Sequence, residues 1–233
     1  CYLGSLVHKS AEIADKFISL GWHDRGIKNL EIGGSLFDFK PSSYNFSTKK
    51  NHKICFVAGA LLARAPQHSS SYSFCGYGAL QSIRFTEIFL SNLSQEIINN
   101  IYFRAYPLER LNGVAKYDYE DVLKDRFNFC YFDTSNNDSK KIMLDSELVI
   151  INYLSTSHLE TLSMNIPTIV IFDADSYHLN KSHLHFFDGL IEAGVIQNSP
   201  HEASQFLDSI YSSINDWWLG EGVQKARTAF INS

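Results

Sequence analysis

The 233-residue sequence lacks the marks of several large protein classes. It contains no apolar run of about 18 residues, so no membrane-spanning helix is predicted. Its first residues, CYLGSLVHKS, lack the charged and apolar regions of a secretory signal peptide. Positive charge is not in excess, because 20 Lys and Arg stand against 25 Asp and Glu, and the net charge of −5 argues against nucleic acid as a partner.

Cysteine is scarce and irregularly placed. The four cysteines (Cys1, Cys55, Cys75 and Cys130) are widely spaced, and no C-x-x-C pair occurs. This pattern argues against a zinc knuckle and against the disulfide framework of a small secreted protein. Cys55 and Cys130 lie within apolar, strand-like runs, so we expect both to be buried, reduced thiols.

Three common motifs are also missing. The sequence has no G-x-G-x-x-G, which disfavours a dinucleotide cofactor, no G-x-x-x-x-G-K-[ST], which excludes nucleotide hydrolysis of the P-loop kind, and no G-x-S-x-G. His178, His183 and His185 do not fall at spacings that make one ligand face of a helix. We therefore predict neither a cofactor nor a metal site.

The sequence does contain a regular alternation of apolar and amphipathic segments, with 45% hydrophobic residues, as expected for a folded domain. Continuous apolar runs suit strands buried on both faces, and helical periodicity between them suits amphipathic helices. This alternation predicts an α/β fold, a Rossmann-like doubly wound parallel sheet. The expected strands are 53–62, 101–106, 127–133, 148–154, 167–172 and 195–198, and the expected helices are 78–100, 137–147, 155–165, 177–194 and 199–218.

Two of these helices carry strong signals at their ends. Ser199, Pro200 and Glu202 have the spacing of an N-cap, a first-turn proline and a capping-box glutamate. Gly194 suits a C-terminal glycine cap. A plausible Asp or Asn cap precedes the helix expected at 137–147.

Residues 1–50 differ in character from the rest. Segments 15–22 and 28–39 are typical of two strands of a neighbouring domain, and 42–51 is polar like a linker. Because the sequence also lacks an initiator Met, we expect 1–50 to be the tail of a preceding domain plus a linker, with the rest of that N-terminal domain missing. Residues 51–233 are expected to form the Rossmann-like domain with C-terminal helices.

The first candidate site is a hydroxyl-rich helix start. Open α/β sheets bind ligands at the carboxyl ends of their strands. After one predicted strand, Ser155, Thr156 and Ser157 lie at a helix start, where unpaired N–H groups and the helix dipole favour a phosphate. The alternative is that these hydroxyls only cap the helix, with Glu160 three residues after Ser157 fitting a capping box.

Two arginines follow other predicted strands. Arg104 ends an apolar strand, where a buried guanidinium requires a partner. A ligand phosphate would supply one, and a salt bridge to Glu109 or Asp118 is the alternative. Arg64 lies in a polar loop long enough to reach over a bound nucleotide, although a lone loop arginine is more often only solvated.

The segment STSHLETLSMNIPTI resembles the Ser/Thr-rich loop, glutamate, short helix and proline-led strand in the C-terminal domain of GT-B glycosyltransferases. More narrowly, the chain resembles a family of transferases encoded in bacterial O-antigen and surface-polysaccharide loci. Four patterns carry this resemblance over nearly the whole chain: Tyr153, Ser155, Thr156, Leu159, Glu160, Leu162, Asn165, Pro167 and Thr168; Arg104, Tyr106 and Pro107; Trp217, Trp218, Val223, Gln224, Ala226, Arg227 and Phe230; and Asp15, Phe17, Gly21 and Trp22.

The resemblance implies a GT-B glycosyltransferase that moves a sugar from a CMP-, UDP- or GDP-linked donor to a glycan or lipid-linked acceptor. The product would be a bacterial surface polysaccharide or O antigen. Arg104 and Ser155–Ser157 would contact phosphate and Glu160 the ribose or donor sugar, without a metal. The resemblance implies a cytoplasmic location, and a peripheral position at the inner face of the membrane stays open.

The chain departs from the family at its start. A His-Gly-Gly element expected shortly before Asp15 is absent, and the chain begins Cys1–Ser5 instead. We therefore expect the donor-binding half of the enzyme, incomplete alone, with its catalytic residue unassigned. Two other functions stay open: a GT-B-like nucleotide-sugar epimerase or hydrolase, which needs no acceptor, and a non-catalytic binding module, for which Trp217 and Trp218 would suit a docking face.

Overall fold

The computed structural model describes residues 13–20, 30–33, 44–62, 74–75, 77–107, 118–154, 156–172 and 185–231. The predicted site residues Arg64 and Ser155 lie outside these ranges, as do His178 and His183.

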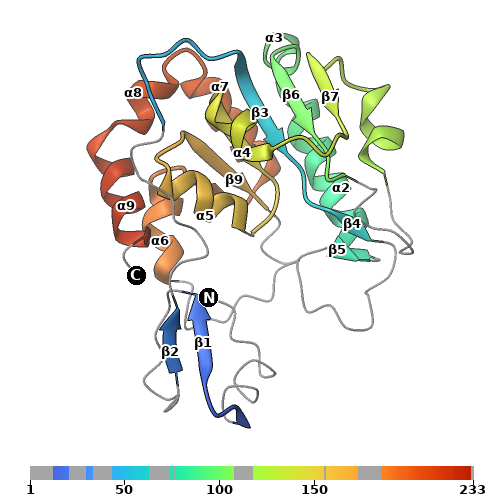
Figure 1. The fold of residues 1–233 in the computed structure, drawn as a ribbon. Coiled ribbons are helices and arrows are strands. Elements are labelled where there is room, and N and C mark those ends of the chain that lie inside the picture. The colour runs from blue at the N-terminus through green and yellow to red at the C-terminus, as the bar shows by residue number, and fades with distance from the viewer. Residues whose placement is uncertain are drawn as a thin grey trace.

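A six-stranded sheet forms the centre of the molecule (Figure 1). Its strands are β3 (His52–Val57), β6 (Ile101–Arg104), β7 (Tyr131–Asp133), β8 (Ser146–Ile151), β9 (Thr168–Ile171) and β10 (Ile196–Gln197). They lie in the order β10-β9-β8-β3-β6-β7, and every neighbouring pair is parallel. The chain starts in the middle at β3, adds β6 and β7 on one side, and then crosses back to add β8, β9 and β10 on the other. The predicted Rossmann-like α/β class is confirmed.

The central strands are apolar along their length because both of their faces are buried. In β3, Ile54 and Phe56 pack into one hydrophobic cluster, whereas Cys55 and Val57 pack into another. Strand β8 shows the same alternation. Burial on both faces removes the alternation of polar and apolar residues that marks a half-exposed strand. The continuous apolar runs in the sequence therefore indicated the central strands correctly.

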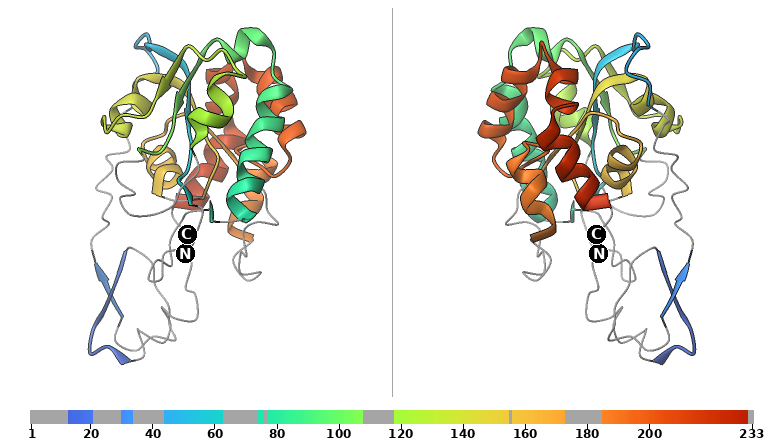
Figure 2. Two further views of the ribbon diagram at one scale, coloured as in Figure 1. Left: turned by 90° about the vertical axis from the view of Figure 1, so that its right-hand side faces the viewer. Right: turned by 90° about the vertical axis from the view of Figure 1, so that its left-hand side faces the viewer.

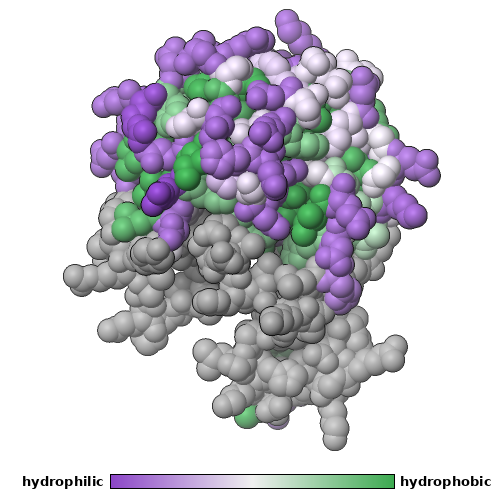
Figure 3. Space-filling model, turned by 180° about the vertical axis from the view of Figure 1, so that it is seen from behind, coloured by the Kyte–Doolittle hydropathy of each residue, from purple (hydrophilic) through white to green (hydrophobic). Residues whose placement is uncertain are grey.

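Helices cover the two faces of the sheet (Figure 2). The layer behind the sheet in Figure 1 contains α2 (Tyr77–Ser91), α3 (Gln95–Ile98), α7 (Pro200–Ile210) and α8 (Ile214–Trp218). The layer in front contains α4 (Ser139–Leu144) and α5 (Thr156–Ser163). Helices α6 (His185–Glu192) and α9 (Glu221–Ile231) pack together beside β9 and β10. Seen from behind, the outer surface of the helical layer is largely hydrophilic with separated apolar patches, as expected of amphipathic helices (Figure 3).

The predicted helix ends are confirmed. The Ser199 hydroxyl accepts a hydrogen bond from the Glu202 N–H at 3.3 Å, with Pro200 in the first turn of α7. Asp138 caps α4 by accepting from the Lys140 N–H at 3.0 Å. Gly194 has a φ of +76°, and a Cβ there would lie 2.4 Å from the Phe206 ring, so glycine is required at this position.

The described segments before residue 51 differ in whether they contact the main sheet. Strands β1 (Phe17–Leu20) and β2 (Leu30–Gly33) pair in parallel outside the main sheet, within the segments expected to be strands (Figure 1). Part of the expected linker contacts the main sheet: Tyr44 is buried, and its hydroxyl donates to the Ser146 carbonyl at 2.9 Å. A single buried aromatic residue in a polar segment leaves no sequence pattern from which this contact could be predicted. The assignment of 1–50 to a preceding domain stays a prediction.

Several local expectations require correction. The helix predicted at 199–218 is divided into α7 and α8 by residues 211–213, and the helix predicted at 78–100 is divided into α2 and α3 by residues 92–94. Helix α9 and the π-helical turn η2 (Glu120–Lys124) were not predicted. Cys55 is buried as expected, but Cys130 is exposed because β7 begins only at the next residue and is the edge strand of the sheet.

Within the described ranges, no helix is both long and apolar enough to cross a bilayer.

Candidate functional site

The strand order marks the junction of β3 and β8 as a candidate ligand position. The chain leaves these two neighbouring strands in opposite directions across the sheet, since β3 leads toward β6 and β8 leads toward β9. At such a switch point the loops diverge and leave a crevice at the carboxyl ends of the strands, where α/β proteins bind ligands. The two loops here are residues 58–60, after β3, and residues 152–154, which lead toward α5.

Asn152 joins these two loops. Its side chain is buried, and its Oδ1 accepts from the Gly59 N–H at 2.8 Å. Its Nδ2 donates to the Thr86 hydroxyl at 3.1 Å and to the Tyr119 hydroxyl at 2.8 Å. The amide thus ties both sides of the switch point to α2 and to the residue before η2. The position of this residue, directly after the apolar run LVII, was the only signal in the sequence that could have indicated its role.

Tyr153 forms the next contact at the same edge. A Cβ at position 59 would lie 3.1 Å from the Tyr153 ring, so the ring lies directly against the backbone of Gly59. The Tyr153 hydroxyl is hydrogen-bonded to the Ser157 hydroxyl at 2.8 Å. Gly59 is therefore needed for the close approach of the two loops, and Tyr153 connects β8 to the first turn of α5.

The start of α5 presents its N–H groups at this edge. Thr156 is exposed, Ser157 is partly buried, and the first N–H groups of any helix lack acceptors within the helix. Ser157 is the second residue of α5, so it is not the N-cap and the proposed Ser157–Glu160 capping box is wrong. Its hydroxyl is instead paired with Tyr153.

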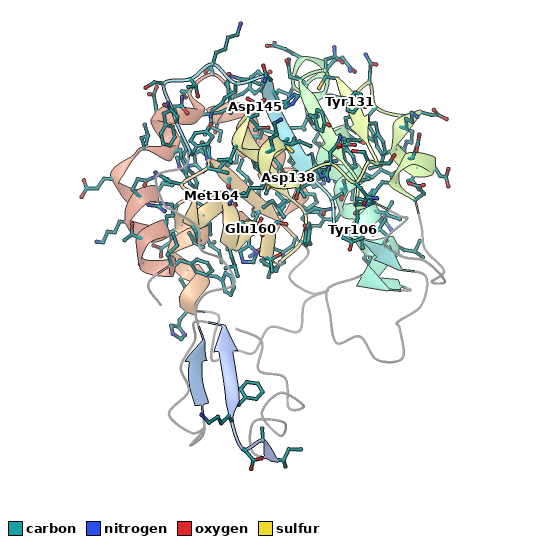
Figure 4. The ribbon with its side chains drawn as sticks, viewed as in Figure 1. Tyr106, Tyr131, Asp138, Asp145, Glu160 and Met164 are labelled. Carbon is teal, nitrogen blue, oxygen red and sulfur yellow. The ribbon has the colours of Figure 1, made fainter. Side chains whose placement is uncertain are left out.

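Glu160 lies one turn further along α5 and is half buried. Burial raises the pKa of its carboxyl, and nearby Asp138 reinforces this shift while Lys140 opposes it. Figure 4 shows Glu160 and Asp138 in front of the sheet, from α5 and from the start of α4. Its predicted contact with a ribose or donor sugar stays a prediction.

Arg104 lies at the carboxyl end of β6 and is 4% exposed. Its guanidinium donates to Asp133 at 2.5 Å and to the Asn137 carbonyl at 2.5 Å. Burial alone would raise the pKa of Asp133, but hydrogen bonds from Ser135 and Tyr102 and the charge of Arg104 leave it lowered. The carboxyl is therefore ionised and forms a buried ion pair. The acidic partner of Arg104 is Asp133 rather than Asp118, and Glu109, the other acid considered from the sequence, lies outside the described residues.

This geometry bears on the predicted phosphate contact of Arg104. Arg104 and Ile151 both pair with Val57 of β3, so the ends of β6 and β8 are two strand spacings apart, or about 10 Å, and α5 begins beyond the end of β8. Two nitrogens of the guanidinium are already used by Asp133 and Asn137. The arrangement favours a role in holding the loop between β7 and α4, and the direct phosphate contact stays a prediction.

The opposite end of α5 is held by the C-terminal helices. Asn165, with a left-handed φ of 58°, accepts from Trp218 Nε1 at 2.9 Å and from Gln224 Nε2 at 3.2 Å. Arg227 donates to the Leu162 carbonyl near the end of α5 at 2.7 Å, and the same carbonyl accepts from the Asn165 N–H at 3.2 Å. Helices α8 and α9 therefore fix the position of α5, and with it the N–H groups at the carboxyl edge of the sheet.

His158 lies in the first turn of α5 and contacts α9. It is buried, its ring centroid is 6.3 Å from that of Phe230 on α9, and burial lowers its pKa to about 4. It is therefore neutral at physiological pH and acts as part of the packing between α5 and α9.

Of the predicted site residues, Thr156, Ser157 and Glu160 lie together on α5, and Arg104 ends β6, which is separated by β3 from the strand β8 that leads to α5. Asn152 and Gly59 were not predicted from the sequence.

The sheet order, the switch point and the position of α5 define an α/β protein of the Rossmann-like class. A family model described as LIC12162 family transferase matches residues 3–233. The chain therefore belongs to this family and is, by its family, a transferase. No curated protein and no solved structure gives a significant match to the chain.

Proposed function

We propose that the chain is the donor-binding half of a GT-B glycosyltransferase. It would bind a CMP-, UDP- or GDP-linked sugar in the cytoplasm, and the sugar would pass to a glycan or lipid-linked acceptor of a bacterial surface polysaccharide or O antigen. Family membership supports the transfer chemistry. The choice of a nucleotide-linked donor rests on one observation, the position of the N-terminus of α5 at the β3–β8 switch point.

The start of α5 suits a phosphate of the donor for electrostatic reasons. Its N–H groups and the positive end of its dipole face the carboxyl edge of the sheet, and the Thr156 and Ser157 hydroxyls add donors. During transfer, negative charge develops on the leaving nucleotide phosphate, and fixed donors stabilise that charge without rearranging. Tyr153, together with helices α8 and α9 at the opposite end of α5, would keep these donors in place.

Nucleotide binding tests this proposal directly. We expect one of CMP, UDP and GDP to raise the melting temperature, because a ligand that binds only the folded state stabilises it by about 2.7 kcal/mol at 100 times its Kd. Calorimetric titration should then show about tenfold weaker binding for the Thr156→Val/Ser157→Ala double variant, which loses two hydroxyl donors.

Ser209→Ala is the matched control, because Ser209 is an exposed hydroxyl on α7, away from this edge. It should bind the nucleotide as the unchanged protein does. No response to any of the three nucleotides, or equal affinity for the double variant and the control, would contradict the proposal.

A further inference from the structure

Tyr153 connects the loop after β3 to the start of α5. Its ring lies against the backbone of Gly59, where a Cβ would be only 3.1 Å from the ring carbons. Its hydroxyl lies 2.8 Å from the Ser157 hydroxyl in the first turn of α5. One side chain therefore spans the two sides of the β3–β8 switch point.

Gly59 is in turn held by Asn152. The Asn152 Oδ1 accepts from the Gly59 N–H at 2.8 Å, and its Nδ2 donates to Thr86 and Tyr119. The side chains of Asn152, Thr86 and Tyr119 are all buried. Breaking a hydrogen bond in such a network leaves a polar group unpaired away from water, so the network holds one geometry. The Tyr153 ring therefore packs on a fixed piece of backbone.

The hydrogen bond from Gly59 also removes one donor from the loop after β3. In many nucleotide-binding α/β folds, the N–H groups after the first strand bind phosphate. Here the Gly59 N–H is already used by Asn152, and the missing side chain at this position makes room for Tyr153 rather than for a ligand. We therefore expect phosphate donors at this edge from α5, where Ser157 lies.

The hydrogen bond between Tyr153 and Ser157 has a preferred direction. A phenol is more acidic than an alkyl hydroxyl and is the better donor, whereas a serine oxygen accepts one hydrogen bond while it donates another. With Tyr153 as the donor, the Ser157 proton stays available to an acceptor outside the helix. Hydrogen bonds in a chain polarise one another, which makes the serine hydroxyl a stronger donor.

We propose that Tyr153 is a positioning residue of the donor site, which directs the Ser157 hydroxyl proton toward the donor phosphate without touching the phosphate itself. This inference rests on the proposed function, which assigns that phosphate to the start of α5. The contacts from Asn152 to Gly59 and from Gly59 to the Tyr153 ring orient the Ser157 donor before the ligand arrives. Donors fixed in advance stabilise developing negative charge without rearranging.

Calorimetric titration of the full chain with CMP, UDP and GDP tests the proposal. Tyr153→Phe keeps the ring on Gly59 and removes only the hydroxyl, so it should weaken binding of the preferred nucleotide about threefold, close to the worth of one neutral hydrogen bond. In a Ser157→Ala background, the same change should alter affinity by less than about 1.5-fold, because Tyr153 acts through Ser157. In a Thr156→Val background, the threefold loss should remain, since Thr156 is not part of this chain of contacts.

Two controls separate positioning from a general loss of structure. Tyr131→Phe removes the hydroxyl of an exposed tyrosine on the edge strand β7, three strands away from β8, and should leave nucleotide affinity unchanged. The nucleoside of the preferred nucleotide, which has no phosphate, should bind Tyr153→Phe as well as it binds the unchanged protein. A structural defect would weaken the nucleoside and the nucleotide alike.

The proposal is overturned if Tyr153→Phe binds the nucleotide as tightly as the unchanged protein or more tightly, because Ser157 would then be the donor to Tyr153. It is also overturned if the loss is as large in the Ser157→Ala background, or if the nucleoside is weakened equally.

If none of the three nucleotides binds, the proposed function fails, and inorganic pyrophosphate then serves as the probe in amide NMR. Pyrophosphate should shift the amide signals of residues 156–158, less so in Tyr153→Phe, and should leave the Gly59 signal in place. A shift of the Gly59 signal, no response at 156–158, or the same response in both proteins would overturn this inference as well.

Discussion

At the scale of single residues, Asn152 is the clearest case of a buried polar group with a defined purpose. Its amide forms hydrogen bonds with Gly59, Thr86 and Tyr119. Asn152→Ala should therefore lower the free energy of unfolding by about 2–4 kcal/mol, because these groups stay buried and lose their partner. Urea unfolding measures the change.

The control for this variant is Asn215→Ala. Asn215 is exposed on α8, so its replacement should alter stability by less than about 0.5 kcal/mol. A loss of stability no greater at position 152 than at 215 would show that the amide does not join the two loops.

The Arg104–Asp133 pair allows a structural role to be separated from a binding role. Arg104→Ala should cost about 3–5 kcal/mol of stability, because it leaves the Asp133 carboxylate buried and uncompensated. The double variant Arg104→Met/Asp133→Leu should recover part of that loss, since neither charge then remains, while the Tyr102 hydroxyl and the Ser135 N–H lose their acceptor. Urea unfolding of the two variants gives both values.

Nucleotide affinity of the double variant decides what Arg104 does. If the guanidinium only holds the loop before α4, the folded double variant should bind nucleotide nearly as well as the unchanged protein. An affinity at least about tenfold lower would instead indicate a direct phosphate contact, because a tenfold loss corresponds to roughly one charged hydrogen bond.

His158 should make the stability of the protein depend on pH. Because its pKa is about 4 when folded and 6.5 in its ordinary state, the unfolded chain binds a proton in this interval that the folded protein does not. Stability from this source is complete above about pH 6.5 and is lost as the pH falls toward 4, by about 3 kcal/mol in total.

Urea unfolding between pH 7 and pH 4 should show a smaller loss for His158→Gln than for the unchanged protein. His201→Gln, an exposed histidine on α7, should leave the pH dependence unchanged. Asp133 does not obscure this window, because its lowered pKa places its own loss of stability at more acidic pH. Identical pH dependence in both variants would show that His158 is not held neutral.

At the scale of elements, the C-terminal clamp on α5 connects two distant parts of the chain. Arg227→Ala removes one of the two donors to the Leu162 carbonyl, and we expect a stability loss of about 1 kcal/mol. Amide hydrogen exchange within α5 should become faster, and nucleotide affinity should fall with it. Lys225→Ala, exposed on the same helix, should change neither. Unchanged exchange in α5 for Arg227→Ala would mean that α9 does not hold α5.

The elements differ in how well the sequence predicted them. Strands β3, β8 and β9 were clear because burial on both faces leaves uninterrupted apolar runs. Helix α7 was predicted because Ser199, Pro200 and Glu202 form an N-cap signal that can be recognised from neighbouring residues alone. Helix α9 was missed although Val223, Ala226 and Phe230 recur at helical spacing, because these apolar positions are few and two of them are only partly buried.

At the scale of the whole molecule, the sequence predicted which edge of the sheet holds the candidate site. It did not predict the contacts between side chains within that site. Alternating strands and helices indicated where carboxyl ends would gather, and so the start of α5. The partner of Arg104 could not be chosen, because Asp133 is 29 positions away and the sequence offers many acids. Asn152 was missed for the same reason, since its partners come from three different elements.

The central position of β8 beside β3 has a consequence for how the chain folds. Residues that meet across this pair are far apart in sequence, as with Lys53 and Glu147, which are 94 positions apart. The loss of chain entropy on joining them precedes the gain from burying their side chains, and such long-range pairing slows folding. The half of the sheet built from β3, β6 and β7 leaves one side of β3 unpaired until β8 arrives. During that interval β3 presents an open apolar edge, so refolding yield should fall with protein concentration as other chains compete for it.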